Sequence, residues 1–285
     1  MSFLKKLRRG YIWERIFRER LSEPVHLNLL ALPVALFGSF ELKIYFDLVI
    51  RQAHAFALLN AARKAKASGI GEITAVEFGV ANGAGLINIC DIAKRVTAVT
   101  GVHFRVFGFD SGTGMPPPRD ARDHPEYYLA GDFPMEDRAA LSARLPAFAR
   151  LVIGDVMQTV SDIAVELRAA PLGFVSMDVD YYWSTVEALR IFTHPPECYL
   201  PTVDLYLDDL MFEGHSPAGG ELLAVAEFNA ANERRKIFAH RMLAEKRLFR
   251  RGDWIAHMHT FHVLDHAERQ TNFAHNRSRH VLVGI

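Results

Sequence analysis

Short apolar runs alternate with amphipathic stretches along most of the chain from residue 73 onward. The apolar runs have the length of buried strands, whereas the stretches between them have the spacing of helices that cover a sheet. The pattern predicts strands over 73–78, 104–109, 150–153, 173–177 and 203–207, and helices over 85–99, 135–144, 161–169, 184–192 and 219–232. Two later runs, 236–242 and 254–264, are expected to close the sheet as an antiparallel edge pair. The fold class is therefore α/β, with helices flanking a mostly parallel sheet.

The first 70 residues lie outside this alternation and are expected to form a helical extension to a domain that spans 71–285. Their most apolar run, Val25 to Phe40, resembles a membrane anchor, but it is short for a span and contains His26, Asn28 and Pro33. We therefore expect no stable membrane span. The extension would cover a binding site or join copies of the chain in a homo-oligomer. Contact with a membrane surface stays open, because the first twenty residues place aromatic side chains among basic ones.

Composition narrows the classes of partner and location. Lys and Arg total 33, as do Asp and Glu, so the chain has no net charge with which to attract nucleic acid. Half of the residues are hydrophobic, which is enough for a sizeable core. Cys90 and Cys198 are the only cysteines and form no disulfide framework, which favours a reducing, cytoplasmic location.

A glycine-rich segment follows the first predicted strand. It contains Glu77, Gly79, Asn82, Gly83 and Gly85, at the point where the strand gives way to a helix. Glycines let the backbone turn sharply and let a ligand approach without a Cβ atom in the way. Gly79 and Gly83 lie four residues apart, which differs from the dinucleotide-binding spacing and disfavours a nicotinamide cofactor. A tight strand-to-helix turn without a ligand is the alternative.

Acidic residues end the second and third predicted strands. Asp110, followed by Ser111, stands where a carboxylate accepts both ribose hydroxyls of an adenosine group. Asp155 ends the third strand in a similar way and is expected near an adenine edge. An Asp at a strand end also serves as a helix cap or turn former, which is the alternative for both.

Four carboxylates follow the fourth and fifth predicted strands: Asp178 and Asp180, then Asp208 and Asp209. Two such charges about 4 Å apart repel by about 4 kcal/mol near a protein surface. No Arg or Lys stands within three positions of either pair, so a divalent cation that prefers oxygen ligands, Mg²⁺ above all, is expected to hold them. In the alternative interpretation, Asp180 and either Asp208 or Asp209 serve as helix caps, and the remaining carboxylates are solvated.

Taken together, these motifs resemble class I S-adenosylmethionine-dependent methyltransferases, in particular the macrocin O-methyltransferase group with its metal-dependent sugar methyltransferases. The resemblance covers about residues 73–232 and rests on 77–83, 108–116, 154–155, 178–185 and 207–209. It implies a Rossmann-like sheet of seven strands that binds S-adenosylmethionine. Two features depart from the group. Residues 198–202 replace a Gly-Gly pair, and Tyr181 and Tyr182 occupy the stretch where a relative has its catalytic histidine.

The resemblance also implies roles for individual residues. By position, the cofactor loop would include Glu77, Gly79 and Gly83, the ribose would bind Asp110, and the metal would bind Asp178, Asp208 and Asp209. The expected reaction is metal-assisted methyl transfer to a hydroxyl oxygen of a small molecule, such as a sugar, a natural product or a catechol. Asp178, Tyr181 and His215 are the candidate catalytic residues. A non-catalytic S-adenosylmethionine-binding partner subunit and a nicotinamide-dependent oxidoreductase are the alternatives.

Two further segments carry weaker expectations. Residues 113–134 are long for a connection and are expected to form either a lid over the acceptor or a plain surface loop. His257, His259, His262 and His266 match no zinc spacing and are interpreted as polar positions on an edge strand, with the first two on one face.

Overall fold

A single sheet of seven strands, in the order β3-β2-β1-β4-β5-β7-β6, forms the centre of the molecule. The computed structural model describes residues 16–210 and 216–271. The strands are β1 Glu72–Phe78, β2 His103–Asp110, β3 Ala149–Ile153, β4 Leu172–Met177, β5 Tyr199–Leu207, β6 Arg235–Ala239 and β7 Met258–Val263. Strands β1 to β5 run parallel, whereas β7 pairs antiparallel with both β5 and β6. The expected α/β fold with a mostly parallel sheet of seven strands is confirmed.

Helices connect the strands and cover the sheet. The α-helices are α3 Val25–Phe37, α4 Phe40–Tyr45, α5 Gln52–Ala67, α6 Ala84–Thr100, α7 Arg138–Arg144, α8 Val156–Thr159, α9 Ala164–Ala169, α10 Tyr182–Ala188, α11 Gly220–Ala231, α12 Trp254–His257 and α13 Ala267–Thr271. The shorter turns are the π-helix η1 Ile16–Arg20 and the 3-10 helices η2 Ala121–Asp123, η3 Val160–Ile163, η4 Leu189–Thr193, η5 Pro196–Cys198 and η6 Ala244–Lys246. The helix predicted over 161–169 is thus divided between η3 and α9.

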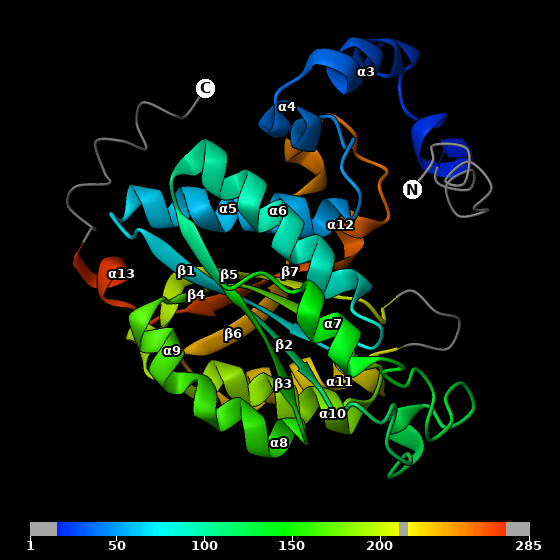
Figure 1. Ribbon diagram of the computed structural model, residues 1–285, viewed down its shortest axis with the longest axis vertical. Coiled ribbons are helices and arrows are strands. Elements are labelled where there is room, and N and C mark those ends of the chain that lie inside the picture. The colour runs from blue at the N-terminus through cyan, green and yellow to red at the C-terminus, as the bar shows by residue number, and fades with distance from the viewer. Residues whose placement is uncertain (1–15, 211–215, 272–285) are drawn as a thin grey trace.

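The two faces of the sheet carry separate cores (Figure 1). Helices α5, α6 and α7 pack on one face, and α8 to α11 pack on the other. Side chains of β1 alternate between the two cores, with Ile73 and Ala75 in the first and Val76 and Phe78 in the second. Burial on both faces explains why the parallel strands appear in the sequence as continuous apolar runs.

The C-terminal part of the sheet contains the expected antiparallel pair at its edge, β7 with β6, but differs from the prediction in detail. The run predicted as a strand over 254–264 begins with the helical turn α12, and β7 starts at Met258. Because β7 is inserted between β5 and β6, the edge strand is β6 and not the strand that carries the histidines. His257 is the last residue of α12, and its Nδ1 lies 2.7 Å from the Leu207 carbonyl oxygen. The prediction of an edge strand with His257 and His259 on one face is therefore wrong: an apolar pattern indicates burial, but not which strand lies alongside.

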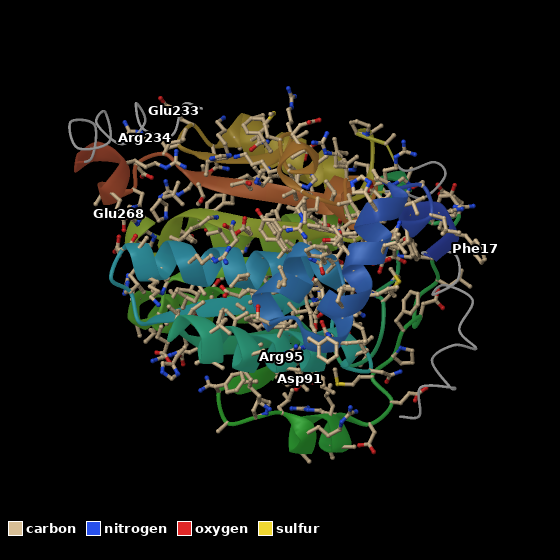
Figure 2. All side chains as sticks on the ribbon, turned by 90° about the horizontal axis from the view of Figure 1, so that it is seen from above. Phe17, Asp91, Arg95, Glu233, Arg234 and Glu268 are labelled. Carbon is tan, nitrogen blue, oxygen red and sulfur yellow. The ribbon has the colours of Figure 1, made fainter. Side chains whose placement is uncertain are left out.

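The N-terminal extension projects from one end of the molecule. In Figure 2 α3 and Phe17 lie at the end opposite to α13 and Glu268. The solvent-facing side of α3 is apolar, with Val25, Leu29, Leu32 and Leu36 between 61% and 73% exposed. No helix of the described residues is long and apolar enough to cross a membrane. The homo-oligomer contact expected for this segment stays a prediction.

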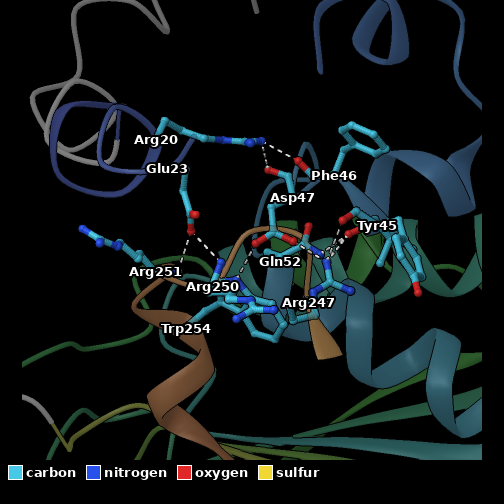
Figure 3. A network of polar contacts seen from close by, with 11 residues as sticks. Arg20, Glu23, Tyr45, Phe46, Asp47, Gln52, Arg247, Arg250, Arg251 and Trp254 are labelled. Carbon is cyan, nitrogen blue, oxygen red and sulfur yellow. Dashed lines mark hydrogen bonds and ion pairs between the residues drawn. The ribbon is translucent and has the colours of Figure 1, made fainter. Parts of the chain in front are cut away.

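A buried polar network joins the extension to the segment between β6 and β7 (Figure 3). The carboxylate of Asp47 forms an ion pair with Arg247, 200 positions away, and accepts a hydrogen bond from Trp254 Nε1 at 3.0 Å. Arg247 also donates to the Ile44 carbonyl oxygen at 2.5 Å, and Arg20 donates to the Asp47 carbonyl oxygen at 2.8 Å. Each side chain of the ion pair is only 4% exposed. The network fixes the turn that leads into α5.

Asp47→Ala should therefore destabilise the protein. The substitution leaves the Arg247 guanidinium buried without its carboxylate, which costs about 3–5 kcal/mol. Urea unfolding of the two proteins measures this difference. Glu41→Ala is the matched control: it removes the exposed ion pair with Arg63 and should change the free energy of unfolding by less than about 1 kcal/mol. Equal unfolding midpoints for wild type and Asp47→Ala would show that the network adds no stability.

Candidate functional site

A cavity of about 920 Å³ lies at the carboxyl ends of the central strands. Its walls come from the glycine-rich loop after β1, the ends of β2, β4 and β5, and the long loop that follows β2. Arg51, immediately before α5, completes the wall. The strand order reverses at β1, and in an open α/β sheet a ligand binds at the carboxyl edge beside this point. The volume is typical of sites for small molecules and cofactors.

The glycine-rich loop brings the ends of β1 and β4 together. Gly79 has a φ of +80°, and a Cβ atom there would lie 1.6 Å from the Asp178 carbonyl oxygen. A Cβ atom on Gly85 would lie 1.9 Å from Glu77 Oε1. Both glycines line the cavity. Gly83 does not line it, because its open side faces the Leu141 side chain, whose Cδ1 would be 2.2 Å from an added Cβ atom.

Asp110 holds the loop in place from the end of β2. Its Oδ2 accepts the backbone N–H groups of Val80 and Ala81, each at 2.8 Å, and its Oδ1 accepts that of Gly112 at 2.6 Å. A carboxylate offers about four acceptor positions, so these bonds leave capacity for about one more. Asp110 lines the cavity and is 9% exposed. It can reach a ligand hydroxyl, but most of its hydrogen-bonding capacity shapes the loop.

The other predicted cofactor residues take different positions. Ser111 and Asn82 line the cavity. Asp155 does not: its Oδ1 accepts the backbone N–H of Met157 at 2.9 Å and so caps α8. The next residue, Val156, reaches the cavity instead. For Asp155 the structure shows the helix cap that was the alternative interpretation.

Three carboxylates form an acidic cluster at the ends of β4 and β5: Asp178, Asp180 and Asp209. One oxygen atom of each lies within 4.8 Å of the others. Asp180 has a φ of +57°, in the left-handed region, at the turn that leads from β4 into α10. Asp208, expected as a metal ligand, lines the cavity but accepts the Tyr206 hydroxyl at its Oδ1, at 2.6 Å. Of the last two aspartates, only Asp209 therefore belongs to the acidic cluster.

Charge repulsion and burial act together on this cluster. Burial, together with the negative charges of Asp208 and Asp180, raises the pKa of Asp178 to about 7. Burial also raises the pKa of Asp209 to about 9, with Asp180 and Asp178 as the main charged neighbours. At neutral pH the cluster therefore retains a proton unless a cation replaces it. Three clustered carboxylates are the donor set that a hard divalent cation prefers, so the residues present fit Mg²⁺.

Two further glutamates lie behind the cluster. Glu221 is fully buried in α11, and its Oε2 accepts the backbone N–H of Asp209 at 3.3 Å. Glu77, at the end of β1, is 2% exposed and lines the cavity. Burial raises the pKa of each glutamate well above its usual range, with the largest charged contribution from Asp209 for Glu221 and from Asp178 for Glu77. The cavity therefore has one strongly acidic side.

The candidate catalytic residues are not all at the cavity. Asp178 lines it, whereas Tyr181 is only 1% exposed and is not among the lining residues. The ring of Tyr181 packs edge-on against Tyr128, with ring centroids 5.9 Å apart. Tyr128 belongs to the long loop after β2, lines the cavity and donates its hydroxyl to Asp209 Oδ1 at 3.4 Å. His215 lies outside the described residues.

Tertiary structure adds residues that the sequence analysis did not assign to the site. Asp180 was among the four carboxylates expected at this edge, with a helix cap as the alternative, but the family resemblance gave it no role as a metal ligand. Tyr128 lies in a segment with no recognisable motif. Arg51 lies in the predicted extension, far from every motif, and nothing in the sequence indicated that it lines the cavity.

Comparisons with known proteins add only distant likenesses. No family model matches the chain, and no curated protein matches it. Among solved structures, the calicheamicin methyltransferase CalS11 aligns over 80% of this chain and 86% of its own, with 19% identity and a TM-score of 0.46. MnmC2 from Aquifex aeolicus aligns over 75% and 61%, with 13% identity and a TM-score of 0.39. The plantazolicin methyltransferase BpumL, in complex with SAH, aligns over 80% and 91%, with 10% identity and a TM-score of 0.32. The function is therefore inferred from the residues of the site.

The acidic cluster predicts how stability depends on pH. A carboxyl group with a raised pKa binds its proton more tightly in the folded chain than in the unfolded one. Below the pKa of an unfolded aspartate, about 3.9, this proton contributes fully to stability. The contribution is lost as the pH rises through the folded-state pKa, about 7 for Asp178 and about 9 for Asp209. In EDTA, the free energy of unfolding should fall over this range, as urea unfolding at a series of pH values would measure.

Two comparisons make this test specific to the cluster. Mg²⁺ should reduce the fall in stability, because a bound cation replaces the protons. Asp209→Asn should reduce it as well, because an amide does not ionise. The same pH dependence in wild type and variant, with no effect of Mg²⁺, would contradict the interpretation of the cluster as a cation site.

Proposed function

We propose that this protein transfers a methyl group from S-adenosylmethionine to a hydroxyl oxygen of a small molecule, with a divalent cation held by the acidic cluster. The observation that carries the proposal is the composition of the cavity. One side is a glycine-rich loop with a ribose-binding candidate, and the other is a set of clustered carboxylates. The two sides share one space, so a donor and an acceptor can lie next to each other.

The glycine side provides a position for the methyl donor. The backbone of Gly79 leaves the end of β1 open to a ligand, and Asp110 retains capacity for about one further hydrogen bond, to a ribose hydroxyl. Val156 supplies an apolar contact on the side where an adenine would lie. When bound, the donor supplies a methyl group already activated by its sulfonium. The task of the protein is to align donor and acceptor, which can contribute about 7–11 kcal/mol.

The acidic side provides a position for the acceptor. Asp178, Asp180 and Asp209 would hold Mg²⁺, which when bound lowers the pKa of a contacting hydroxyl. A carboxylate of the same cluster is then close enough to accept the hydroxyl proton. Tyr128 and Tyr127 line the cavity from the long loop and would pack against the acceptor. This placement supports the expectation that the loop over 113–134 is a lid.

The acceptor that this cavity favours is a small molecule with one or more hydroxyl groups. Aromatic side chains of the loop offer flat apolar contacts, and the cation offers a ligand position for one or two hydroxyl oxygens. A sugar or a catechol has both an apolar face and adjacent hydroxyls. The identity of the acceptor, oxygen as the methylated atom and the role of Mg²⁺ all belong to this proposal.

The proposal predicts separate effects on turnover and on donor binding. Asp209→Asn should lower turnover by on the order of 100-fold, because the cation contributes several kcal/mol to the transition state. Its affinity for S-adenosylhomocysteine should stay within a few-fold of wild type, because the donor lies on the glycine side. Transfer of a labelled methyl group to a panel of sugars and catechols, with Mg²⁺ or EDTA, measures the first quantity, and titration calorimetry the second.

Asp91→Asn is the matched control, since Asp91 is exposed on α6 and does not line the cavity (Figure 2). It should change neither quantity. Full activity in EDTA would show that the acidic cluster is structural. Binding of S-adenosylhomocysteine without turnover on any acceptor would favour the non-catalytic partner subunit, and binding of NAD in its place would favour an oxidoreductase.

A further inference from the structure

Arg51 is the one basic residue among the described residues that line the main cavity. It is exposed, and no described residue forms a hydrogen bond or an ion pair with its guanidinium. It also lines an adjoining cavity of about 220 Å³, together with Gln52, His54 and Tyr206. An arginine without a hydrogen bond or ion pair among the described residues, placed in a cavity that is otherwise strongly acidic, requires an explanation beyond solubility.

The backbone of Arg51 is held in an unusual conformation. Its φ is +53° and its ψ +64°, in the left-handed region, at the residue that precedes α5. A long side chain is uncommon there, and such conformations persist mainly where the surrounding structure imposes them, often at functional sites. The Asp47–Arg247 network fixes the same turn four residues earlier. The fold therefore holds Arg51 in its position at the cavity.

The charges in the cavity show what this position can recognise. Arg51 lines the same cavity as Glu77, at the end of β1, and Asp178, which follows β4. A donor with its ribose at Asp110 and its adenine near Val156 directs its amino-acid end toward this part of the cavity. That end is a zwitterion. Its ammonium group matches the carboxylates, but its carboxylate needs a cation.

We propose that the guanidinium of Arg51 binds the carboxylate of the amino-acid part of S-adenosylmethionine. The inference rests on the proposed function and extends it to a residue from the N-terminal extension. A guanidinium suits this task because its planar N–H groups match the two oxygens of a carboxylate. Arg51 would then fix the amino-acid end of the donor and so orient the donor in the cavity, with its methyl group available to an acceptor at the acidic cluster.

The test compares two adenosine ligands. S-adenosylhomocysteine carries the amino-acid part, and 5′-methylthioadenosine keeps the adenosine and the thioether but lacks it. Arg51→Gln should weaken S-adenosylhomocysteine about 10- to 100-fold, the range for a charge-assisted hydrogen bond, and leave 5′-methylthioadenosine unchanged. Arg51→Lys should restore part of the loss, because it keeps the charge but not the bidentate geometry. Titration calorimetry on the full chain measures the affinity of each protein for both ligands.

Arg63→Gln is the matched control, because Arg63 is exposed on α5, the helix that follows Arg51, and lies outside the cavity. It should bind both ligands as wild type does, and melting curves confirm that each variant is folded. Equal affinities of wild type and Arg51→Gln for S-adenosylhomocysteine would overturn the inference. If the KM for the acceptor rises in that case, Arg51 contacts the acceptor and not the donor. Parallel losses for both ligands would overturn the inference too. If wild type binds no S-adenosylhomocysteine, the proposed function itself fails.

Discussion

Repulsion among carboxylates at one edge of the sheet is the constraint on which the site depends. Parallel strands all end on the same side, so the acidic residues that follow β4 and β5 must meet there. One oxygen atom each of Asp178, Asp180 and Asp209 lies within 4.8 Å of the others, and partial burial reduces the water that would screen their charges. Such an arrangement favours a bound proton or cation at this edge of the sheet. The proposed function assigns this place to a divalent cation.

The glycine-rich loop satisfies a steric requirement at the same edge. Gly79 lets the end of β1 approach the Asp178 carbonyl, and the carboxylate of Asp110 fixes the loop from β2. The two sides of the cavity that the proposal assigns to donor and cation are thus held by adjacent strands, with Glu77 and Asp178 between them. A shift of β1 against β4 would disturb both sides at once. This shared edge is the physical basis for the proposal that one cavity aligns a donor with an acceptor.

The N-terminal extension contributes to the site through a contact distant in sequence. The buried pair of Asp47 and Arg247 fixes the turn before α5, and α5 packs on the sheet beneath the cavity wall. Arg51 lies at the end of that turn. The N-terminal extension, which was expected to cover a binding site, thereby supplies part of the cavity wall. Its exposed apolar helix α3 is a separate feature, for which the oligomer contact remains a prediction.

The sequence by itself determined the fold class, because burial on both faces of a parallel sheet leaves continuous apolar runs that can be recognised in one chain. It also placed Glu77, Gly79, Asp110 and Asp178 at strand ends, and therefore near one edge. Local patterns do not report which elements become neighbours. Insertion of β7 beside β5, capping of α8 by Asp155 and the choice of Asp180 over Asp208 are outcomes of strand order and backbone direction. Arg51 depended on tertiary structure altogether, since only the packing of α5 and a contact 200 positions away bring it to the cavity.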